Sequence, residues 1–190
     1  MTQRNAIENS AQKTALRDAF GAFATGVTVV TMRDAQGNPM GFTANSFTSV
    51  SLDPALLLIC LGRSSSKLRE FSQTNRFAVN VLAANQTHIS RRFAASHDDR
   101  FTGVEWHLQD GGAPLIAGAS AWFDCTCVSV QDAGDHIILL GQIVAYERSA
   151  HAPLIYLQGR YLQAPSDLSV DQTGFVTTAQ AVFEHEDRPQ

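Results

Sequence analysis

The sequence predicts a mainly β protein: a small antiparallel barrel with short helices between its strands. Short runs of β-branched and apolar residues recur along the chain, and turn-forming residues separate several of them. No long helical segments alternate with these runs, which argues against a doubly wound parallel sheet. At 190 residues, the chain suits one domain with a substantial core.

Composition excludes several classes of function. Apolar residues make up 44% of the chain and charged residues 17%, as in globular proteins. The net charge of −4 and the lack of a basic stripe exclude a nucleic-acid-binding protein. The longest apolar run is far shorter than the roughly 20 residues that span a bilayer, and the polar N-terminus lacks the apolar region of a signal peptide. Three cysteines, an odd number, do not indicate a disulfide scaffold, so we expect a cytoplasmic protein without membrane association.

The N-terminal part begins with polar residues 1–13, which we expect to form a mobile arm. Apolar residues then recur at helical spacing, which predicts a helix over 14–24 that Gly26 ends. Strands are predicted over 27–32 and 40–47, with a turn at 36–39, and together they form a β-hairpin.

Residues 41–61 are the most informative segment. They open with small and hydroxylated residues, pass a Leu-Asp-Pro corner at 52–54, and close with seven consecutive apolar residues at 55–61. The apolar part predicts a strand that is buried on both faces. The first part offers backbone amides, hydroxyls and a side-chain amide, with little bulk to exclude a flat ligand. Such a polar wall beside a rigid strand can hold a heteroaromatic ring such as a flavin.

The rest of the chain continues the pattern. Strands are predicted over 76–82, 121–130 and 136–146, with a last extended segment at 153–163. Short helices are predicted after serines 64–66 and over 86–94, and a long loop with a brief strand at 96–118. After Ala164 the chain becomes polar, and we expect a tail that is loose or docks on a partner.

Eight ordered motifs carry a resemblance to a known family. They are TGVTVVT (25–31), GFTANSFTSVSLDPALLLICL (41–61), SSSK (64–67), RFAVNVL (76–82), RRFA (91–94), DRF (99–101), GDH (134–136) and PLIYLQGRY (153–161). Over residues 16–163 the chain resembles the short-chain NAD(P)H:flavin oxidoreductases, or flavin reductases. The resemblance implies an FMN-binding split β-barrel with Greek-key-like antiparallel topology over residues 14–163, preceded by the arm and followed by a tail at 164–190.

The same resemblance implies an activity and partners. Family members transfer a hydride from NADH or NADPH to FMN or FAD, and they typically supply reduced flavin to a separate oxygenase in a two-component monooxygenase. It also implies a homodimer. Two alternatives stay open: a reductase with tightly bound FMN that serves another acceptor, such as a corrinoid, and a non-catalytic barrel that binds flavin or heme. The sequence selects neither between FMN and FAD nor between NADH and NADPH.

The polar strand edge is the candidate flavin wall. The expected contacts are Gly41, Phe42, Thr43, Ala44, Asn45 and Ser46, followed by Cys60, Leu61 and Gly62. Amides and hydroxyls here would bind the pyrimidine side of the ring and stabilise the negative charge of the reduced flavin. The alternative is an ordinary polar strand end, with Cys60 as inert packing.

Two further groups are candidates for the flavin phosphate and side chain. Ser65, Ser66 and Lys67 lie where a strand becomes a helix, so free amides, hydroxyls and one cation suit a phosphate; the alternative is a plain N-cap. Arg92, Phe93 and Ala94 match a second flavin-contacting turn of the family. Arg92 would reach the phosphate or ribityl chain and Phe93 would pack on the ring; the alternative is a surface arginine beside a core phenylalanine.

The nicotinamide side is assigned by resemblance to His136 and to Tyr156, Gly159 and Tyr161. Hydride transfer needs no protein acid, so we assign His136 a positioning role rather than that of a base. The alternatives are an exposed turn histidine and a terminal strand whose tyrosines pack on the core.

No metal site is expected. Cys125 and Cys127 form a C-x-C on one strand face, for which core packing is the favoured interpretation. The acidic and histidine residues 184–187 are interpreted as part of a solvated tail.

Overall fold

The computed structural model describes residues 9–95 and 99–163. Residues 1–8 of the expected arm at 1–13, the tail at 164–190 and the cluster at 184–187 lie outside the described residues. The elements are α1 (Ser10–Gly21), β1 (Thr25–Gly26), β2 (Thr28–Arg33), β3 (Pro39–Ala44), β4 (Thr48–Leu52), β5 (Ala55–Gly62), α2 (Leu68–Phe71), β6 (Arg76–Val81), α3 (Thr87–Ala94), β7 (Trp106–His107), β8 (Leu115–Ile116), β9 (Ala121–Ala133), β10 (His136–Arg148), β11 (Leu154–Leu157) and β12 (Arg160–Gln163). The prediction of a mainly β, antiparallel protein is confirmed.

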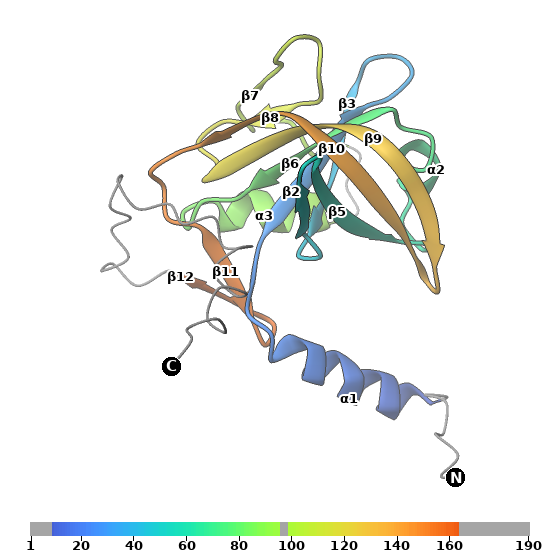
Figure 1. The fold of residues 1–190 in the computed structure, drawn as a ribbon. Coiled ribbons are helices and arrows are strands. Elements are labelled where there is room, and N and C mark those ends of the chain that lie inside the picture. Colours follow the sequence, from blue (N-terminus) through green and yellow to red (C-terminus); the bar gives the residue numbers. More distant parts are fainter. Residues whose placement is uncertain (1–8, 96–98, 164–190) are drawn as a thin grey trace, which may run out of the picture.

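One curled sheet dominates the fold (Figure 1). It has seven strands in the order β3-β2-β6-β9-β10-β5-β4, and all its neighbouring pairs are antiparallel. A smaller sheet contains β1, β11 and β12, while β7 and β8 form a separate pair. Helix α1 lies outside the curled sheet, near the β11–β12 hairpin (Figure 1). Among the described residues, no helix combines the length and the apolar character that crossing a bilayer requires.

Ser46 lies between β3 and β4, and its side chain extends the contact between β4 and β5 beyond their paired residues. Its Oγ accepts a hydrogen bond from the Cys60 N–H at 2.9 Å and donates one to the Cys60 carbonyl at 3.2 Å. The hydroxyl thus takes the place of the backbone partners that an adjacent strand would offer. As a result, the segment that follows β3 lies beside the end of β5.

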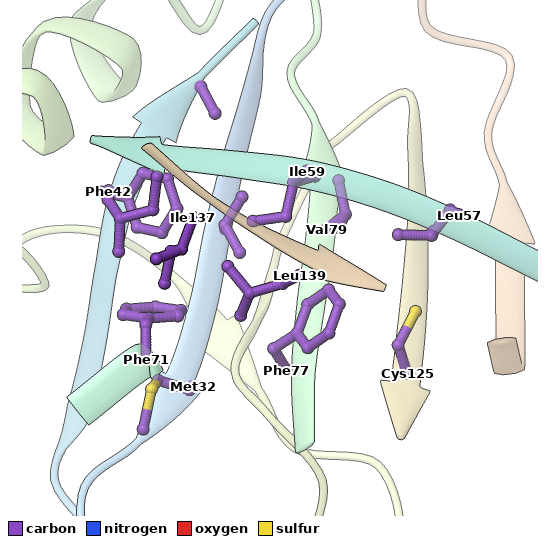
Figure 2. Packing of buried hydrophobic residues seen from close by; sticks show 13 residues of the cluster. Met32, Phe42, Leu57, Ile59, Phe71, Phe77, Val79, Cys125, Ile137 and Leu139 are labelled. Carbon is purple, nitrogen blue, oxygen red and sulfur yellow. The ribbon is translucent and has the colours of Figure 1, made fainter. Parts of the chain in front are cut away.

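The main core fills the inside of the curl (Figure 2). Phe71, Phe77, Ile59 and Leu139 are fully buried there, and the rings of Phe42 and Phe71 meet edge-on at 4.9 Å. Strand β5 contributes alternate residues to this core, because a strand points successive side chains to opposite faces. The prediction that this strand is buried on both faces was therefore wrong: its other face is only half-buried in the chain.

Several predicted boundaries also differ. Helix α1 begins earlier, at Ser10, because Asn9 and Gln12 form a capping box, and it ends at Gly21, so Gly26 is a strand residue rather than a helix stop. The segment predicted as one extended piece at 153–163 is a hairpin. Its turn residues Gln158 and Gly159 have φ of 47° and 77°, a left-handed geometry that glycine adopts readily.

Candidate functional site

The polar segment 41–46 lies at the centre of the candidate site. Gly41 packs so closely that an added Cβ would lie 2.8 Å from Phe93 Cε1 and 2.9 Å from the Val30 carbonyl oxygen. Gly41, Phe42 and Ala44 are buried, whereas Asn45 is exposed. The segment therefore presents its polar end to solvent while its first half is fixed in the core.

The two hydroxyls of this segment have partners within the protein. Thr43 Oγ1 donates to the Ser90 carbonyl at 2.7 Å, and Ser46 is bound to Cys60 as described above. Each hydroxyl proton therefore already has an acceptor within the protein, so these hydroxyls can contact a ring only as acceptors. The exposed side-chain amide of Asn45 is the polar group that this segment offers to a ligand.

Two cations lie at the Gly41 end of the segment. Lys67 and Arg100 line one pocket of about 170 Å³ together with Gly41 and Phe101. Arg100 Nη1 donates to the Gly41 carbonyl at 2.8 Å. Arg92 Nε donates to the Arg100 carbonyl at 3.0 Å, so Arg92 holds the loop that carries Arg100. Sequence reasoning assigned no role to Arg100, although the DRF motif contained it.

An acid shares this pocket, but its oxygens are engaged in its own turn. Asp34 Oδ1 accepts from the Gln36 and Asn38 amides, and Oδ2 accepts from the Asn38 side chain. These bonds, led by the one from the Asn38 side chain, lower the pKa of Asp34. The carboxylate therefore stays charged, with its hydrogen bonds directed into the turn.

The serine segment differs from its expected geometry. The Ser65 N–H donates to the Gly62 carbonyl at 3.0 Å, and the Lys67 N–H donates to Ser65 Oγ at 3.2 Å. Lys67 is the N-cap of α2, a single turn of helix, and makes no side-chain capping bond. The expectation of free amides is wrong for these two residues. Ser66 lies exposed beside them, and the cation of Lys67 is what reaches the pocket.

Phe93 is a core residue. It is fully buried, meets Phe101 edge-on at 4.9 Å, and lies directly beneath Gly41. It has no exposed face for a ring to pack on, so the core alternative holds for Phe93. Ala94 is exposed at the end of α3.

His136 lies beside Gly62. The two residues are opposite each other in the β10–β5 pair, and His136 Nε2 is 3.6 Å from the position that a Cβ on Gly62 would occupy. Nδ1 is bonded to Asp135 Oδ1 at 2.7 Å, and this bond lowers the pKa of Asp135. The carboxylate thus fixes the ring through Nδ1, while Nε2 points towards the end of β5. The side chain is 48% exposed and open to a ligand.

The closing hairpin lines a second pocket. This pocket of about 510 Å³ is bordered by Asn45, Tyr156, Gln158, Gly159 and the end of α1. Tyr161 is held elsewhere: its hydroxyl lies 2.9 Å from Ser90 Oγ, and Arg91 lies over its ring at 5.7 Å. Tyr156 and Gly159 therefore belong to the pocket, whereas Tyr161 connects the hairpin to α3.

The cysteines are packing residues. Cys125 is fully buried, and burial raises the pKa of its thiol to about 12. Burial also raises the pKa of Cys127. Both thiols are protonated at neutral pH and unreactive. In the described part of the chain, no group of His, Cys, Asp and Glu is suited to hold a metal ion.

The geometry defines a class of protein. An exposed polar strand end follows the buried Gly41, a pair of cations lines the pocket at Gly41, and an oriented histidine lies beside Gly62. This arrangement suits a flat heteroaromatic ligand that carries phosphate, so the class is a nucleotide- or flavin-binding β protein.

Comparison with known proteins defines the family. Residues 20–165 match the flavin reductase like domain, and the chain belongs to that family. The reductase component of the flavin-dependent trigonelline monooxygenase of Acinetobacter baylyi is 50% identical over 156 residues, which are 82% of this chain and 50% of that protein. A Rhizobium meliloti relative is 52% identical over 147 residues, 77% of this chain and 47% of its own length. The chain thus spans about half the length of these two curated relatives.

Shorter relatives and solved structures match along most of their length. The FMN reductase (NADH) of Agrobacterium fabrum is 43% identical over 148 residues, 76% of this chain and 82% of that protein. The NADH:FAD oxidoreductase of Streptomyces globisporus, solved with NAD and FAD fragments, has a TM-score of 0.78 at 40% identity. That match covers 86% of this chain and 99% of the other.

Proposed function

We propose that this chain is an NAD(P)H-dependent flavin reductase, which transfers a hydride from a nicotinamide to FMN or FAD. The observation that carries the proposal is the setting of segment 41–46. Lys67 and Arg100 lie at its first residue, and its last residue is bonded to Cys60, next to Gly62 and His136. The names of the relatives, an FMN reductase (NADH) and an NADH-dependent FAD reductase, support the same reaction.

The two ends of the segment suit the two ends of a flavin. Strand β3 ends at Ala44, so the polar residues Asn45 and Ser46 lie in the bend that follows, while Gly41 lies at the pocket of the two cations. The ring then lies near Asn45 and Gly62, and the phosphate lies near Lys67 and Arg100, where two cations neutralise its charge. Bound flavin supplies the acceptor for the hydride.

The chain's own contribution to the reaction is positioning. Asp135 orients His136, whose Nε2 faces Gly62 and can hydrogen-bond a nicotinamide carboxamide. Tyr156 and Gly159 line a pocket together with Asn45. Holding donor and acceptor in contact in a water-poor gap is the main requirement of hydride transfer.

The client is proposed from the relatives. The Acinetobacter baylyi relative and a Mycobacterium tuberculosis relative are reductase components of flavin-dependent monooxygenases. We therefore propose that reduced flavin from this chain serves a separate oxygenase. The location in the cytoplasm that the sequence predicts stays part of the proposal.

A homodimer is proposed as the working form. Its support is a set of large apolar side chains exposed on β4 and β10: Val50 at 47%, Leu52 at 61% and Tyr146 at 72%. Sedimentation of the full chain is expected to give twice the mass of one chain, and a monomer at all concentrations contradicts this part of the proposal.

Kinetics with added flavin test the function. The purified chain is expected to oxidise NADH or NADPH only when FMN or FAD is present. Protein that remains yellow after dialysis and needs no added flavin indicates tightly held flavin and another acceptor. If nicotinamide never bleaches bound flavin under anaerobic conditions, the chain is a flavin-binding protein without reductase activity, and the proposal is wrong.

A further inference from the structure

The turn between β9 and β10 presents His136, and the residues of this turn are exposed. Ala133 ends β9 and pairs with His136, so Gly134 and Asp135 form a two-residue loop at the outer end of the hairpin (Figure 1). Gly134 has a φ of 64°, which suits the first loop residue of a tight hairpin turn. Residues 134–136 are all exposed. Because exposed residues gain little from apolar packing, the position of this turn depends on polar contacts.

Arg63, the residue that follows β5, supplies these contacts. Its backbone N–H donates to the Asp135 carbonyl at 2.9 Å, and its Nε donates to the Gly134 carbonyl at 3.2 Å. Its Nη2 forms an ion pair with the Asp132 carboxylate on β9. One residue thus binds both residues of the loop and the strand that leads into it.

These contacts lie next to the group that the proposed reaction uses. The regular pairing of β10 with β5 ends at His136 and Gly62, and Arg63 continues the contact past that pair. Asp135 Oδ1 accepts a hydrogen bond from His136 Nδ1 at 2.7 Å, since an ionised carboxylate has no proton to donate. The direction of Nε2 on the same ring therefore depends on where Arg63 holds Asp135.

We propose that Arg63 is a positioning residue for the nicotinamide: it holds the loop so that Asp135 fixes the His136 ring with Nε2 towards Gly62. The inference rests on the proposed function, which gives His136 its contact with the nicotinamide. The side chains of Arg63 and Asp132 are 41% and 82% exposed, and ion pairs this exposed contribute little to folding. The role of Arg63 is therefore to set local geometry rather than to stabilise the fold.

Steady-state kinetics of Arg63→Met test the inference. The variant keeps the backbone N–H and the apolar stem but loses the charge and the side-chain donors. The KM for NADH is expected to rise roughly fivefold, while the KM for FMN and the melting temperature stay close to wild type. Arg69→Met, a change at an exposed arginine of α2, is the matched control, and both of its KM values are expected to match wild type. Equal rises in the two KM values of Arg63→Met, or no rise in either, overturn the proposal.

A double variant shows whether Arg63 acts through His136. In the His136→Ala background, which lacks the ring, Arg63→Met is expected to raise the KM for NADH no further. A second rise of the same size would show that Arg63 acts independently of the ring, and it would overturn the positioning role. If Arg63→Met does not fold, Asp132→Ala provides the comparison with Arg63 in place. A smaller rise confined to the KM for NADH is then expected, and no rise overturns the proposal.

The ring of His136 provides a direct measurement. Nitrogen-15 NMR of histidine-labelled protein, at a pH where the ring is neutral, distinguishes a proton on Nδ1 from one on Nε2, and His136→Ala assigns the signals. In wild-type protein Nδ1 is expected to carry the proton, because Asp135 accepts its hydrogen bond. Arg63→Met is expected to give a mixture of the two tautomers, and an unchanged single tautomer would overturn the proposal. Failure of the proposed function looks different: wild-type protein then reduces flavin with neither nicotinamide, while the tautomers in Arg63→Met still change.

Discussion

The hydrogen bond between Ser90 Oγ and Tyr161 Oη predicts an unusual pattern of stabilities. It joins helix α3 to the hairpin that carries Tyr156, and its length is 2.9 Å. Ser90 is fully buried, whereas Tyr161 is only partly buried. Removing either side chain's hydroxyl breaks the same bond, but the group left behind differs in its access to water.

This difference sets the magnitudes. Ser90→Ala leaves the hydroxyl of a tyrosine that is only partly buried, so the free energy of unfolding should fall by about 1 kcal/mol or less. Tyr161→Phe leaves the serine hydroxyl without this partner in the core, which costs about 1–3 kcal/mol. The double variant removes both groups. It should therefore be more stable than Tyr161→Phe alone, close to Ser90→Ala.

Urea unfolding of the three variants at one fixed protein concentration measures this pattern. Additive losses in the double variant would refute the reasoning, because they would show that the two hydroxyls act independently. Flavin binding should be unchanged, since Thr43 Oγ1 donates to the Ser90 backbone carbonyl, which both substitutions retain. The KM for NADH should rise, because the hairpin bearing Tyr156 loses an attachment.

The other predictions concern the two ends of the site and the core. Lys67→Met should raise the KM for FMN roughly tenfold with little change in the KM for NADH, since it removes one of two cations beside Gly41. Steady-state kinetics measure both values, and an equal rise in the two KM values would contradict the assignment of Lys67 to the flavin phosphate. His136→Ala should raise the KM for NADH more than that for flavin, and Asp135→Ala should do so more mildly because it removes the acceptor that orients the ring. Cys125 should resist alkylation at pH 8 until the protein unfolds, as mass spectrometry of labelled peptides can show. Because burial raises its pKa from 9.0 to about 12, its contribution to stability is complete below pH 9 and lost as pH rises towards 12.

Sequence reasoning located the strands better than their partners. Periodicity placed β2, β6 and α3 within a residue or two, because the pattern of apolar residues depends only on local geometry. It did not show β4 as a separate strand, since residues 48–52 are largely exposed and lack a buried face. The apolar run of β5 also misled: apolar residues on both faces of a strand predict burial, yet within one chain only one face meets the core.

For the site, residue types were informative and hydrogen-bond partners were not. The sequence singled out segment 41–46, but a hydroxyl such as that of Thr43 can bind a ligand or a carbonyl, and only the fold shows that Ser90 is its acceptor. Arg100 was missed because nothing in the spacing of residues 99–101 says which strand that loop will contact.

Ser46 shows why fold and site cannot be separated in this protein. One hydroxyl makes both hydrogen bonds between the end of the polar segment and Cys60. The same contact brings Asn45 near the end of β5, where His136 pairs with Gly62. The side chain that holds segment 41–46 against β5 is therefore also part of the proposed site. Serine is small enough to let the two segments approach and polar enough to satisfy both backbone groups of Cys60. Alanine lacks the hydroxyl, and threonine adds a methyl group.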